Sequence, residues 1–370
     1  MTCWRTSCVS PACRSTRARP PESHSPPRLP GLPPPKAGAM TSLPDPSIPL
    51  SREAAAQAFD LLFDADLPES AIAAFLVTMA RRGETATEIA AAARAMRARM
   101  IPVAAPAGAI DVCGTGGDGS NTINISTTAA IVAAAAGINM VKHGNRSVSS
   151  NSGSADLLKA LGINIDMSPA QAAHCLEQTH FTFLFAPHYH SGVRHAMGVR
   201  TALKTRTIFN ILGPLANPAA PHVQLLGVYD ESLCMPMAQT LKTLGTKRAM
   251  IVHGSGTDEI ALHGPTNVVE LNNGEITQYT LNPSDFDLAN YSLEQLAGEG
   301  PQYNANASLA ILQGKGSDAH NAAIVVNVAA LLYLSGKVQS LKEGAQQVQT
   351  LLSSGKAMNT LNAIIEVSHG

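Results

Sequence analysis

The sequence predicts an α/β protein with a small all-helical domain and a larger α/β domain, in which helices flank a mostly parallel central sheet. Three observations predict this class. Apolar residues follow helical spacing over residues 50–100, short apolar runs then alternate with helical patterns, and a glycine-rich turn follows the first of these runs. With 370 residues the chain is long enough for two such domains. We expect the helical domain at residues 47–106 and the α/β domain at residues 107–370.

Residues 1–39 differ in composition from the rest of the chain. They hold nine of the 24 prolines, and five Arg and one Lys against the single acidic residue Glu22. Such a segment, without apolar periodicity, cannot bury enough surface to offset the entropy lost on ordering. It also contains no apolar run of the length that a secretory signal needs. We predict a disordered or spurious extension, with Met40 as an alternative start.

Charge and cysteine content exclude several classes. The formal net charge is −1, and because residues 1–39 are basic, the remainder carries six excess acidic charges, whereas nonspecific nucleic-acid binders usually carry a basic excess. No run approaches the roughly 18–20 uncharged apolar residues of a spanning helix. Beyond residue 39 the cysteines are Cys113, Cys175 and Cys234, a spacing typical of a reducing cytoplasm rather than of disulfides or zinc. We predict a cytoplasmic protein that binds neither nucleic acid nor a membrane.

Capping signals predict the first helices. Ser51 precedes an apolar stripe with helical spacing. Asp66 lies three residues before Glu69, and Thr85 lies three residues before Glu88, which is the capping-box spacing. These helices carry little obvious chemistry, so we interpret them as a packing or dimerisation domain.

Apolar runs and turn residues predict the sheet. A capped helix start at Ser168 and a hairpin turn at Asn273-Gly274 lie among the strand candidates, and the chain from Ala307 is mostly helical. The strand candidates are residues 109–113, 138–141, 181–185, 223–229 and 249–253.

The strongest local signal is the segment Gly114-Thr115-Gly116-Gly117-Asp118-Gly119, between a strand candidate and a helix that begins near Ser126. Glycines allow positive φ and close backbone approach, so that successive N–H groups can surround phosphate oxygens. The N-terminus of the following helix adds a favourable dipole. The segment lacks the Gly-Lys-Ser/Thr ending of a P-loop and the glycine spacing of the dinucleotide fingerprint. It predicts an anion site of another kind.

Acidic residues near this anion site indicate a metal. A carboxylate at Asp118 would repel a bare phosphate, so it must meet either a metal-bound polyphosphate or a ligand hydroxyl group. Mg²⁺ suits the first alternative, because it is typically shared between carboxylates and substrate phosphates. Asp258-Glu259 follows the strand that ends at His253 and can hold a second ion, although an isolated acidic pair is more often only solvated.

A basic segment at residues 142–150 follows the strand candidate 138–141. It combines two cations with several hydroxyl donors, which suits a second anionic part of the same ligand. We expect it at the carboxyl edge of the sheet, where α/β proteins bind ligands. Ser152-Gly153-Ser154 adds a helix N-terminus suited to a terminal phosphate. His143 fits a structural imidazole as well as a catalytic one.

Four motifs, in this order, resemble the anthranilate phosphoribosyltransferase family. They are the glycine segment 114–119, Asn124-Ile125-Ser126-Thr127, Lys142-His143-Gly144-Asn145-Arg146 with Ser149-Ser150, and Arg206-Thr207-Ile208-Phe209-Asn210-Ile211-Leu212-Gly213-Pro214-Leu215. The likeness runs from about residue 50 to about residue 365, includes Asp258-Glu259, and does not cover the extension before Met40.

The resemblance implies an enzyme of tryptophan biosynthesis that joins anthranilate to 5-phosphoribosyl 1-pyrophosphate (PRPP) and releases pyrophosphate. It implies two hinged domains, with residues 187–212 completing the helical one, and a homodimer formed through the helical domain. It also implies two Mg²⁺ ions per subunit, one on Ser126 and one on Asp258 and Glu259.

The resemblance further implies the residues that hold the two substrates. Anthranilate would contact Gly114, Asn145 and Arg200, whose guanidinium would meet the substrate carboxylate. The channel for the aromatic ring would be lined by Pro187, His143, Gly213 and Pro214. PRPP would be held by Gly114, Gly117, Asp118, Thr122, Asn124, Ile125, Ser126, Thr127, Lys142, His143, Gly144, Asn145, Arg146, Ser147, Val148, Ser149, Ser150 and Ser154.

The implied chemistry needs little acid–base machinery. Departure of pyrophosphate leaves an oxocarbenium-like centre, so that stabilising the leaving group and positioning the amine suffice, and no residue is assigned as general acid or base. Two positions depart from the family pattern. Asn151 stands where many relatives carry Lys, and His190-Ser191-Gly192-Val193 replaces the more usual His-Pro-Ala-Met.

Two alternative functions are weaker. A pyrimidine-nucleoside phosphorylase shares the strand and glycine-loop plan and the Ser-Gly-Ser-Ala-Asp start at 152–156, but it handles a single orthophosphate and needs no acidic pair such as Asp258-Glu259. A non-catalytic paralogue that binds nucleic acid would show a basic surface excess, which the acidic balance beyond residue 39 opposes.

Overall fold

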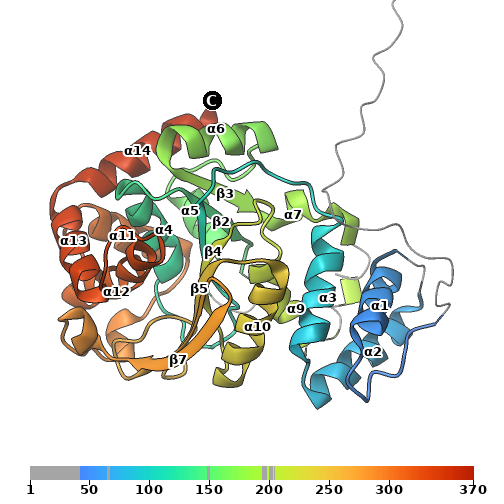
Figure 1. Ribbon diagram of the computed structural model, residues 1–370. Coiled ribbons are helices and arrows are strands. Elements are labelled where there is room, and N and C mark those ends of the chain that lie inside the picture. The colour runs from blue at the N-terminus through green and yellow to red at the C-terminus, as the bar shows by residue number, and fades with distance from the viewer. Residues whose placement is uncertain (1–41, 65–66, 148–150, 194–197, 200–202, 204) are drawn as a thin grey trace, which may run out of the picture. The chain divides into compact units, whose positions relative to one another are not determined.

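A seven-stranded sheet lies at the centre of the α/β part of the chain (Figure 1). The computed structural model describes residues 42–64, 67–147, 151–193, 198–199, 203 and 205–370. The strand order is β3-β2-β1-β4-β5-β6-β7. Neighbouring strands from β3 to β5 are parallel, whereas the β5–β6 and β6–β7 pairs are antiparallel, so the predicted mostly parallel sheet is confirmed. The strands are β1 (Ile110–Gly114), β2 (Met140–Gly144), β3 (Phe181–Phe185), β4 (Val223–Gly227), β5 (Arg248–Gly254), β6 (Thr266–Asn272) and β7 (Glu275–Leu281).

The strand sequences explain their places in the sheet. β1 to β5 overlap the five strand candidates and are mostly buried, as expected for parallel strands covered on both faces. The predicted hairpin turn joins β6 to β7, and both of its residues have positive φ, 48° at Asn273 and 92° at Gly274. That geometry is the one that an Asn-Gly pair favours in a two-residue hairpin.

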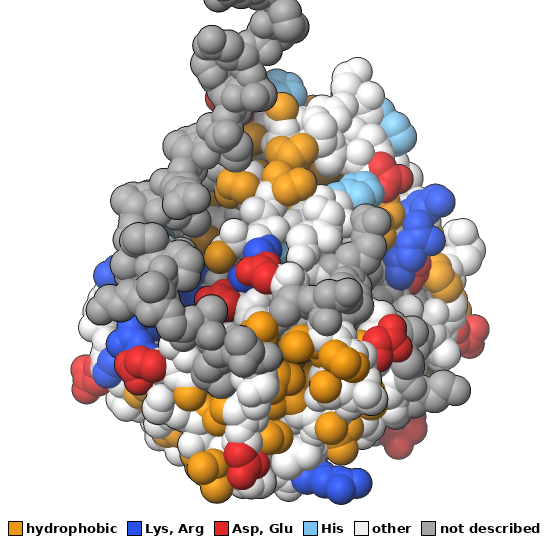
Figure 2. All heavy atoms as spheres, turned by 90° about the vertical axis from the view of Figure 1, so that its right-hand side faces the viewer, with side chains coloured by type: hydrophobic (Ala, Val, Ile, Leu, Met, Phe, Trp, Pro, Cys, Tyr) orange, Lys and Arg blue, Asp and Glu red, His pale blue; other side chains and the backbone are white. Residues whose placement is uncertain are grey.

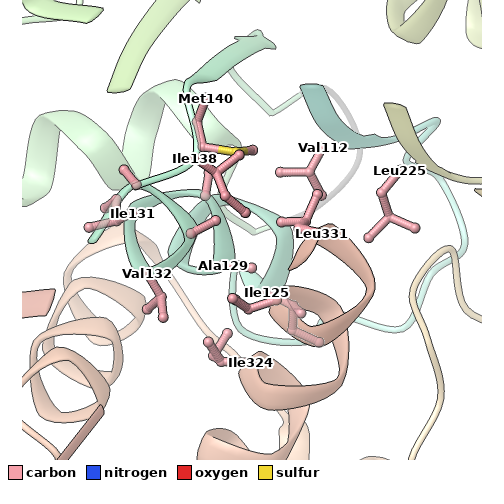
Figure 3. Packing of buried hydrophobic residues seen from close by; sticks show 14 of the residues in the cluster. Val112, Ile125, Ala129, Ile131, Val132, Ile138, Met140, Leu225, Ile324 and Leu331 are labelled. Atoms are coloured by element: carbon pink, nitrogen blue, oxygen red, sulfur yellow. The ribbon is translucent and has the colours of Figure 1, made fainter. Parts of the chain in front are cut away.

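One large hydrophobic cluster covers one face of the sheet. In it, Ile125 and Ala129 of α4 (Ile125–Ala135) face Ile324 and Leu331 of α12 (Asp318–Leu334), beneath the strand residues Val112 and Leu225 (Figure 3). Both helices are apolar around most of their circumference because both are buried. The helices of this cluster are α4 (Ile125–Ala135), α5 (Ser154–Ala160), α6 (Pro169–Thr179), α11 (Pro301–Leu312), α12 (Asp318–Leu334), α13 (Leu341–Ser353) and α14 (Lys356–His369). None of the helices in the described ranges is long and apolar enough to cross a bilayer.

A second cluster joins the N-terminal helices to the opposite face of the sheet through α10 (Cys234–Leu244) (Figure 1). It includes residues of the later segment 208–216, and the rings of Phe63 and Phe209 lie 6.1 Å apart. The domain boundary at 106/107 and the completion of the helical domain by 187–212 stay predictions. The helices here are α1 (Arg52–Asp64), α2 (Glu69–Arg82), α3 (Ala86–Arg97) and α9 (Phe209–Leu212), and the short α7 (Ala186–Tyr189) follows β3.

Two of the predicted capping boxes are confirmed. Thr85 accepts the Glu88 N–H at 3.3 Å, while the Glu88 carboxylate accepts the Thr85 N–H at 2.8 Å and pairs with Arg82 at 2.7 Å. Ser168 caps α6 in the same way. The predicted start at Asp66 lies outside the described residues, and α2 begins at Glu69 without a side-chain cap.

Candidate active site

The predicted site residues lie at the carboxyl edge of the parallel strands. The chain leaves β1 toward β2 on one side and leaves β4 toward β5 on the other, so the edge between β1 and β4 is a topological switch point. Open α/β sheets bind ligands in the crevice at such a point. The glycine segment follows β1, the basic segment includes the end of β2, and the Asp258-Glu259 pair follows β5.

The glycine segment is held in place by backbone contacts. Thr115 N–H donates to Gly227 O at 2.9 Å, and Gly116 N–H donates to Asp258 Oδ2 at 2.7 Å. Gly116 and Gly117 have φ of 68° and 79°, a region that side-chain-bearing residues rarely adopt. These contacts tie the loop to the end of β4 and to the acidic pair beyond β5.

The loop that follows β5 lies directly on the ends of β1 and β4. A Cβ atom at Gly114 would overlap the Asp258 carboxylate, and a Cβ atom at Gly227 would overlap the Asp258 backbone. Glycine at these two positions is what allows the acidic pair to approach the anion loop so closely.

Three carboxylates converge here. Asp258 N–H donates to Asp118 Oδ2 at 3.4 Å, and Ser126 N–H donates to Glu259 Oε1 at 3.2 Å. Burial, and then the charge of Asp118, raise the pKa of Asp258 to about 7. Burial, and then the charge of Asp258, raise the pKa of Glu259 well above its usual value. A bound cation would reverse these shifts, because it would stabilise the charged carboxylates.

The oxygen donors at this edge suit a Mg²⁺ ion that is shared with a bound ligand, rather than an ion held by protein groups alone. Carboxylates of Asp258 and Glu259 and the hydroxyl of Ser126 are the oxygen donors that Mg²⁺ prefers. Across the described ranges, no three His, Cys, Asp or Glu side chains are arranged so that they could hold a metal ion by themselves. Mg²⁺ usually keeps several waters and shares its shell with substrate phosphates, so an incomplete protein shell is the expected form.

Lys142 brings a buried positive charge to the same place. The residue is only 2% exposed, and Nζ donates to Val112 O at 2.7 Å and to Ser126 Oγ at 3.4 Å. Ser126 lies in the first turn of α4. The neighbouring side chains of Ile125 and Thr127 are buried in the protein, so any contact of these two residues with a ligand would come from their backbone.

Asn124 and Thr122 are held by segments distant in sequence. Asn124 Nδ2 donates to Ser152 O at 2.9 Å, and its Oδ1 accepts from Asn304 Nδ2 at 2.9 Å. Thr122 forms an isolated bridge with Ala297. These contacts fix the segment between the glycine loop and α4, and they bring Asn124 next to the start of α5.

The basic segment folds onto the N-terminus of α5. Asn145 O accepts from Ser154 Oγ and from Ala155 N–H, both at 3.2 Å. The Asp156 carboxylate accepts the Ser147 N–H at 3.0 Å. The structure therefore brings together the predicted residues of both segments.

Two further predicted residues of the basic segment have close neighbours. A Cβ atom at Gly144 would overlap the Ser154 hydroxyl, so the two segments touch. The Arg146 guanidinium lies 5.8 Å from the centre of the Phe185 ring. Asn151, the departure from the family pattern, is exposed.

His143 is held as a structural imidazole. Its Nδ1 lies 3.1 Å from Gly213 O and its Nε2 lies 3.2 Å from His190 Nε2. A carbonyl oxygen only accepts, so Nδ1 of neutral His143 carries the proton and Nε2 accepts from His190. Burial, and then His190, lower the pKa of His143 to about 3. Both ring nitrogens are therefore engaged within the protein, which favours the structural interpretation of this residue over the catalytic one.

The other residues predicted to line the aromatic channel lie in two segments. Gly213 contacts His143, and Pro214 O accepts from Gln224 Nε2 at 2.7 Å. Pro187 lies in α7, directly after β3. Four predicted site residues lie outside the described residues: Val148, Ser149, Ser150 and Arg200.

Sequence reasoning missed one side chain that reaches the glycine segment. Arg206 Nη2 donates to Gly117 O, and the Arg206 guanidinium lies 4.1 Å from the centre of the Tyr229 ring. Arg206 is the first residue of the 206–215 motif that carries the family resemblance, and this position was the signal in the sequence that could have marked it as a site residue. Tyr229 carries no such signal, because its role depends on where the chain beyond β4 falls in space.

Comparison with known proteins agrees with this architecture. The family model "Glycosyl transferase family, a/b domain" matches residues 107–358, and "Glycosyl transferase family, helical bundle domain" matches residues 47–100. An anthranilate phosphoribosyltransferase of Pseudoalteromonas translucida is 78% identical over 84% of this chain and 88% of its own length. An anthranilate phosphoribosyltransferase of Shewanella sp. (strain ANA-3) is 53% identical over 86% of this chain and 93% of its own length.

Solved structures are similar as well. The crystal structure of the anthranilate phosphoribosyltransferase of Thermus thermophilus superposes with a TM-score of 0.83 at 39% identity, covering 88% of this chain and 97% of that one. The structure of the anthranilate phosphoribosyltransferase of Saccharomyces cerevisiae in complex with PRPP and Mg superposes with a TM-score of 0.79 at 30% identity, covering 86% of this chain and 94% of that one. The fold and the site thus define a glycosyl transferase with a helical bundle domain and an α/β domain. The chain belongs to the anthranilate phosphoribosyltransferase family.

Asp258→Asn should flatten the pH dependence of stability in metal-free protein. The Asp258 pKa is about 7 in the folded chain against an ordinary value of 3.8, so between these values the unfolded carboxyl is ionised while the folded one keeps its proton. The stability that this proton contributes is present below about pH 4 and is lost as the pH rises toward 7. Urea unfolding in metal-depleted buffer at a series of pH values across this interval measures it.

The expected result is a free energy of unfolding that falls more steeply with pH in the wild type than in Asp258→Asn. Each pKa unit of difference corresponds to about 1.4 kcal/mol. Parallel pH profiles of the two proteins would show that Asp258 does not titrate abnormally.

Proposed function

We propose that this chain transfers the phosphoribosyl group of PRPP to anthranilate, giving N-(5-phosphoribosyl)anthranilate and pyrophosphate. One observation carries the proposal: Asp258 accepts from Gly116 N–H of the glycine loop that contains Asp118, and the adjacent Glu259 accepts from Ser126 N–H at the start of α4. That combination suits a diphosphate accompanied by divalent ions, whereas a lone orthophosphate needs no carboxylates. The names of the relatives and the PRPP and Mg complex of the yeast enzyme support it.

We propose two Mg²⁺ ions per subunit, one held by Ser126 and one by Asp258 and Glu259. When bound, the ions would draw negative charge from the pyrophosphate oxygens as Lewis acids. The raised pKa values of Asp258 and Glu259 support this role, because two desolvated carboxylates without a metal lack an adequate positive partner.

The reaction proposed is a dissociative displacement, in which the bond to pyrophosphate breaks ahead of attack by the amine. The buried ammonium group of Lys142 is fixed before substrate arrives, so it stabilises the leaving charge without reorganisation. The glycine loop and the basic segment orient the two ends of PRPP. His143 is not proposed as the base, because both of its ring nitrogens are engaged. The weakly basic arylamine loses its proton late, to water.

The anthranilate contacts proposed are Gly114, Asn145 and Arg200, with the Arg200 guanidinium on the substrate carboxylate.

We also propose a homodimer formed through the helical domain. Hydrophobic side chains gather on the face of the molecule that carries α1 and α2 (Figure 2), and a contiguous apolar surface of this kind typically marks a contact with another protein.

The proposed function is tested by incubating purified protein with anthranilate, PRPP and Mg²⁺ and following the loss of anthranilate fluorescence. Loss of fluorescence that requires all three components, with release of pyrophosphate, is the expected result. A folded sample that consumes no anthranilate would refute the proposal.

Replacing both Asp258 and Glu259 by Ala should lower kcat at least about a hundredfold, the scale on which removal of groups that stabilise the transition-state charge acts. It should also weaken the dependence of the rate on Mg²⁺ concentration. Rates measured across a Mg²⁺ titration test this expectation. A titration curve that superposes on that of the wild type would remove the metal role of the pair.

Arg200→Ala should mainly raise the KM for anthranilate. Loss of a charge-assisted hydrogen bond to a carboxylate costs about 1.5–3 kcal/mol, which corresponds to roughly ten- to a hundredfold. Initial rates with each substrate varied in turn measure the effect. A change confined to the KM for PRPP would contradict the assignment of Arg200.

A further inference from the structure

The backbone ladder between β1 and β2 opens after its first rung. Ile110 N–H donates to Asn139 O at 2.8 Å, and Ile110 is in register with Met140. This register extends over one residue pair, whereas β1 with β4 and β2 with β3 are each in register over five. In a regular parallel ladder, the next rung would join Val112 N–H to Val141 O and His143 N–H to Val112 O.

Side chains take the place of that rung. Asn217 Nδ2 donates to Val141 O at 2.7 Å, and Lys142 Nζ donates to Val112 O at 2.7 Å. Both carbonyl oxygens that the open ladder leaves inside the protein are thus satisfied, and each by a side chain that is itself buried. Buried backbone groups require a partner, so without these two side chains the ladder could not stay open at low cost.

Asp111 organises the remaining donors. Its carboxylate is fully buried and accepts His143 N–H at 3.3 Å, the Cys113 thiol at 3.6 Å and the side chain of Asn217. Asn217 is also fully buried, and its Oδ1 accepts Ala219 N–H at 2.8 Å. The carboxylate and the amide therefore form one satisfied polar network between the two strands, which rigidifies a core when every member has a partner.

We propose that Asp111 and Asn217 are positioning residues of the PRPP site, which hold β1 and β2 apart so that the Lys142 ammonium group stands at the first turn of α4. With the ladder closed, His143 N–H would occupy Val112 O, and Lys142 Nζ would lose its best acceptor. Lys142 Nζ also reaches Ser126 Oγ at 3.4 Å, and Ser126 N–H contacts Glu259. The network thus sets the place of a positive charge beside the proposed metal ligands.

The physical reason for a functional role is the cost of the arrangement. Burying a carboxylate, an ammonium group and an amide inside a sheet is less favourable than an ordinary ladder with apolar side chains. Departures of this kind from regular packing concentrate at functional sites. The inference rests on the proposed function for the identity of the ligand, and on the contacts of three buried side chains for the geometry.

The test uses Asp111→Asn and Asn217→Ala in the full-length protein. An amide at position 111 cannot accept from every donor that the carboxylate serves, and alanine at 217 leaves Val141 O without its donor. Calorimetry with PRPP and Mg²⁺ should show a Kd raised about tenfold in each variant, as expected for loss of a well-placed charge contact. The KM for anthranilate at saturating PRPP should stay within about twofold of the wild type.

The matched control is Asn327→Leu. Asn327 is fully buried like Asn217, but it lies in α12 and its amide donates to Ala323 O one turn earlier. It should change the midpoint of urea unfolding and leave the Kd for PRPP unchanged. The proposal is overturned if folded Asp111→Asn and Asn217→Ala bind PRPP as the wild type does. It is equally overturned if affinity falls in the control to the same extent, because the effect would then follow stability alone.

Two further outcomes keep the result clear. If the wild type itself binds no PRPP with Mg²⁺, the proposed function fails, whereas normal wild-type binding with unaffected variants overturns only the positioning role. If both variants fail to fold, a crystal structure of the wild-type chain with Mg²⁺ and PRPP decides. Lys142 Nζ on Val112 O supports the proposal, and His143 N–H on Val112 O overturns it.

Discussion

Negative charge buried at the carboxyl edge of the sheet is the constraint on which the site depends. Asp258 and Glu259 are held there by backbone N–H groups of the glycine loop and of α4. Burial raises the pKa of both carboxyls, and the charge of Asp118 adds to the shift of Asp258 and that of Asp258 to the shift of Glu259, which together outweigh these hydrogen bonds. Lys142 supplies a buried positive charge, but it does not offset the burial of both carboxylates. The folded chain therefore has too little positive charge at this edge, and a divalent cation that binds together with its anionic ligand can supply it.

The rest of the fold keeps that edge rigid. One hydrophobic cluster presses α4 and α12 against one face of the sheet, and the other joins α10, the N-terminal helices and the segment around Phe209 on the opposite face. Close packing on both faces leaves the strand ends little freedom. Arg206, which lies shortly before α9, contacts the glycine loop at Gly117. The anion loop is thus tied both to the sheet and to the part of the chain that packs with the helices.

Local signals predicted much of the fold because they act over few residues. The capping box at Thr85 and Glu88 and the turn at Asn273-Gly274 depend on side chains and φ angles within a single turn, and the structure confirms both. The C-terminal helical region begins earlier than predicted. α11 starts at Pro301 with Gly300 at its N-cap, so proline in the first turn of a helix was the signal overlooked.

Contacts between distant segments could not be predicted in this way. Residue type and place after a strand predicted the glycine loop as an anion site, but left Asp258-Glu259 open between a metal site and a solvated pair, which only the family resemblance decided. The structure brings the two segments together. The network of Asp111 and Asn217 depends on the register between β1 and β2 and on a segment far along the chain, whose Asn217 lies 76 residues beyond Val141. A shift of one residue in that register would separate every partner. The engagement of both ring nitrogens of His143 is unpredictable for the same reason.

Gly227 carries a consequence for how this enzyme can diverge. The space that its side chain would fill is occupied by the backbone of Asp258, so a larger residue at 227 is tolerated only after the loop beyond β5 has moved. Moving that loop displaces two carboxylates at once. A larger residue at 227 therefore requires compensating changes in the loop beyond β5, whereas the side chain at 258 is not restricted by this contact, because Gly227 meets only the Asp258 backbone.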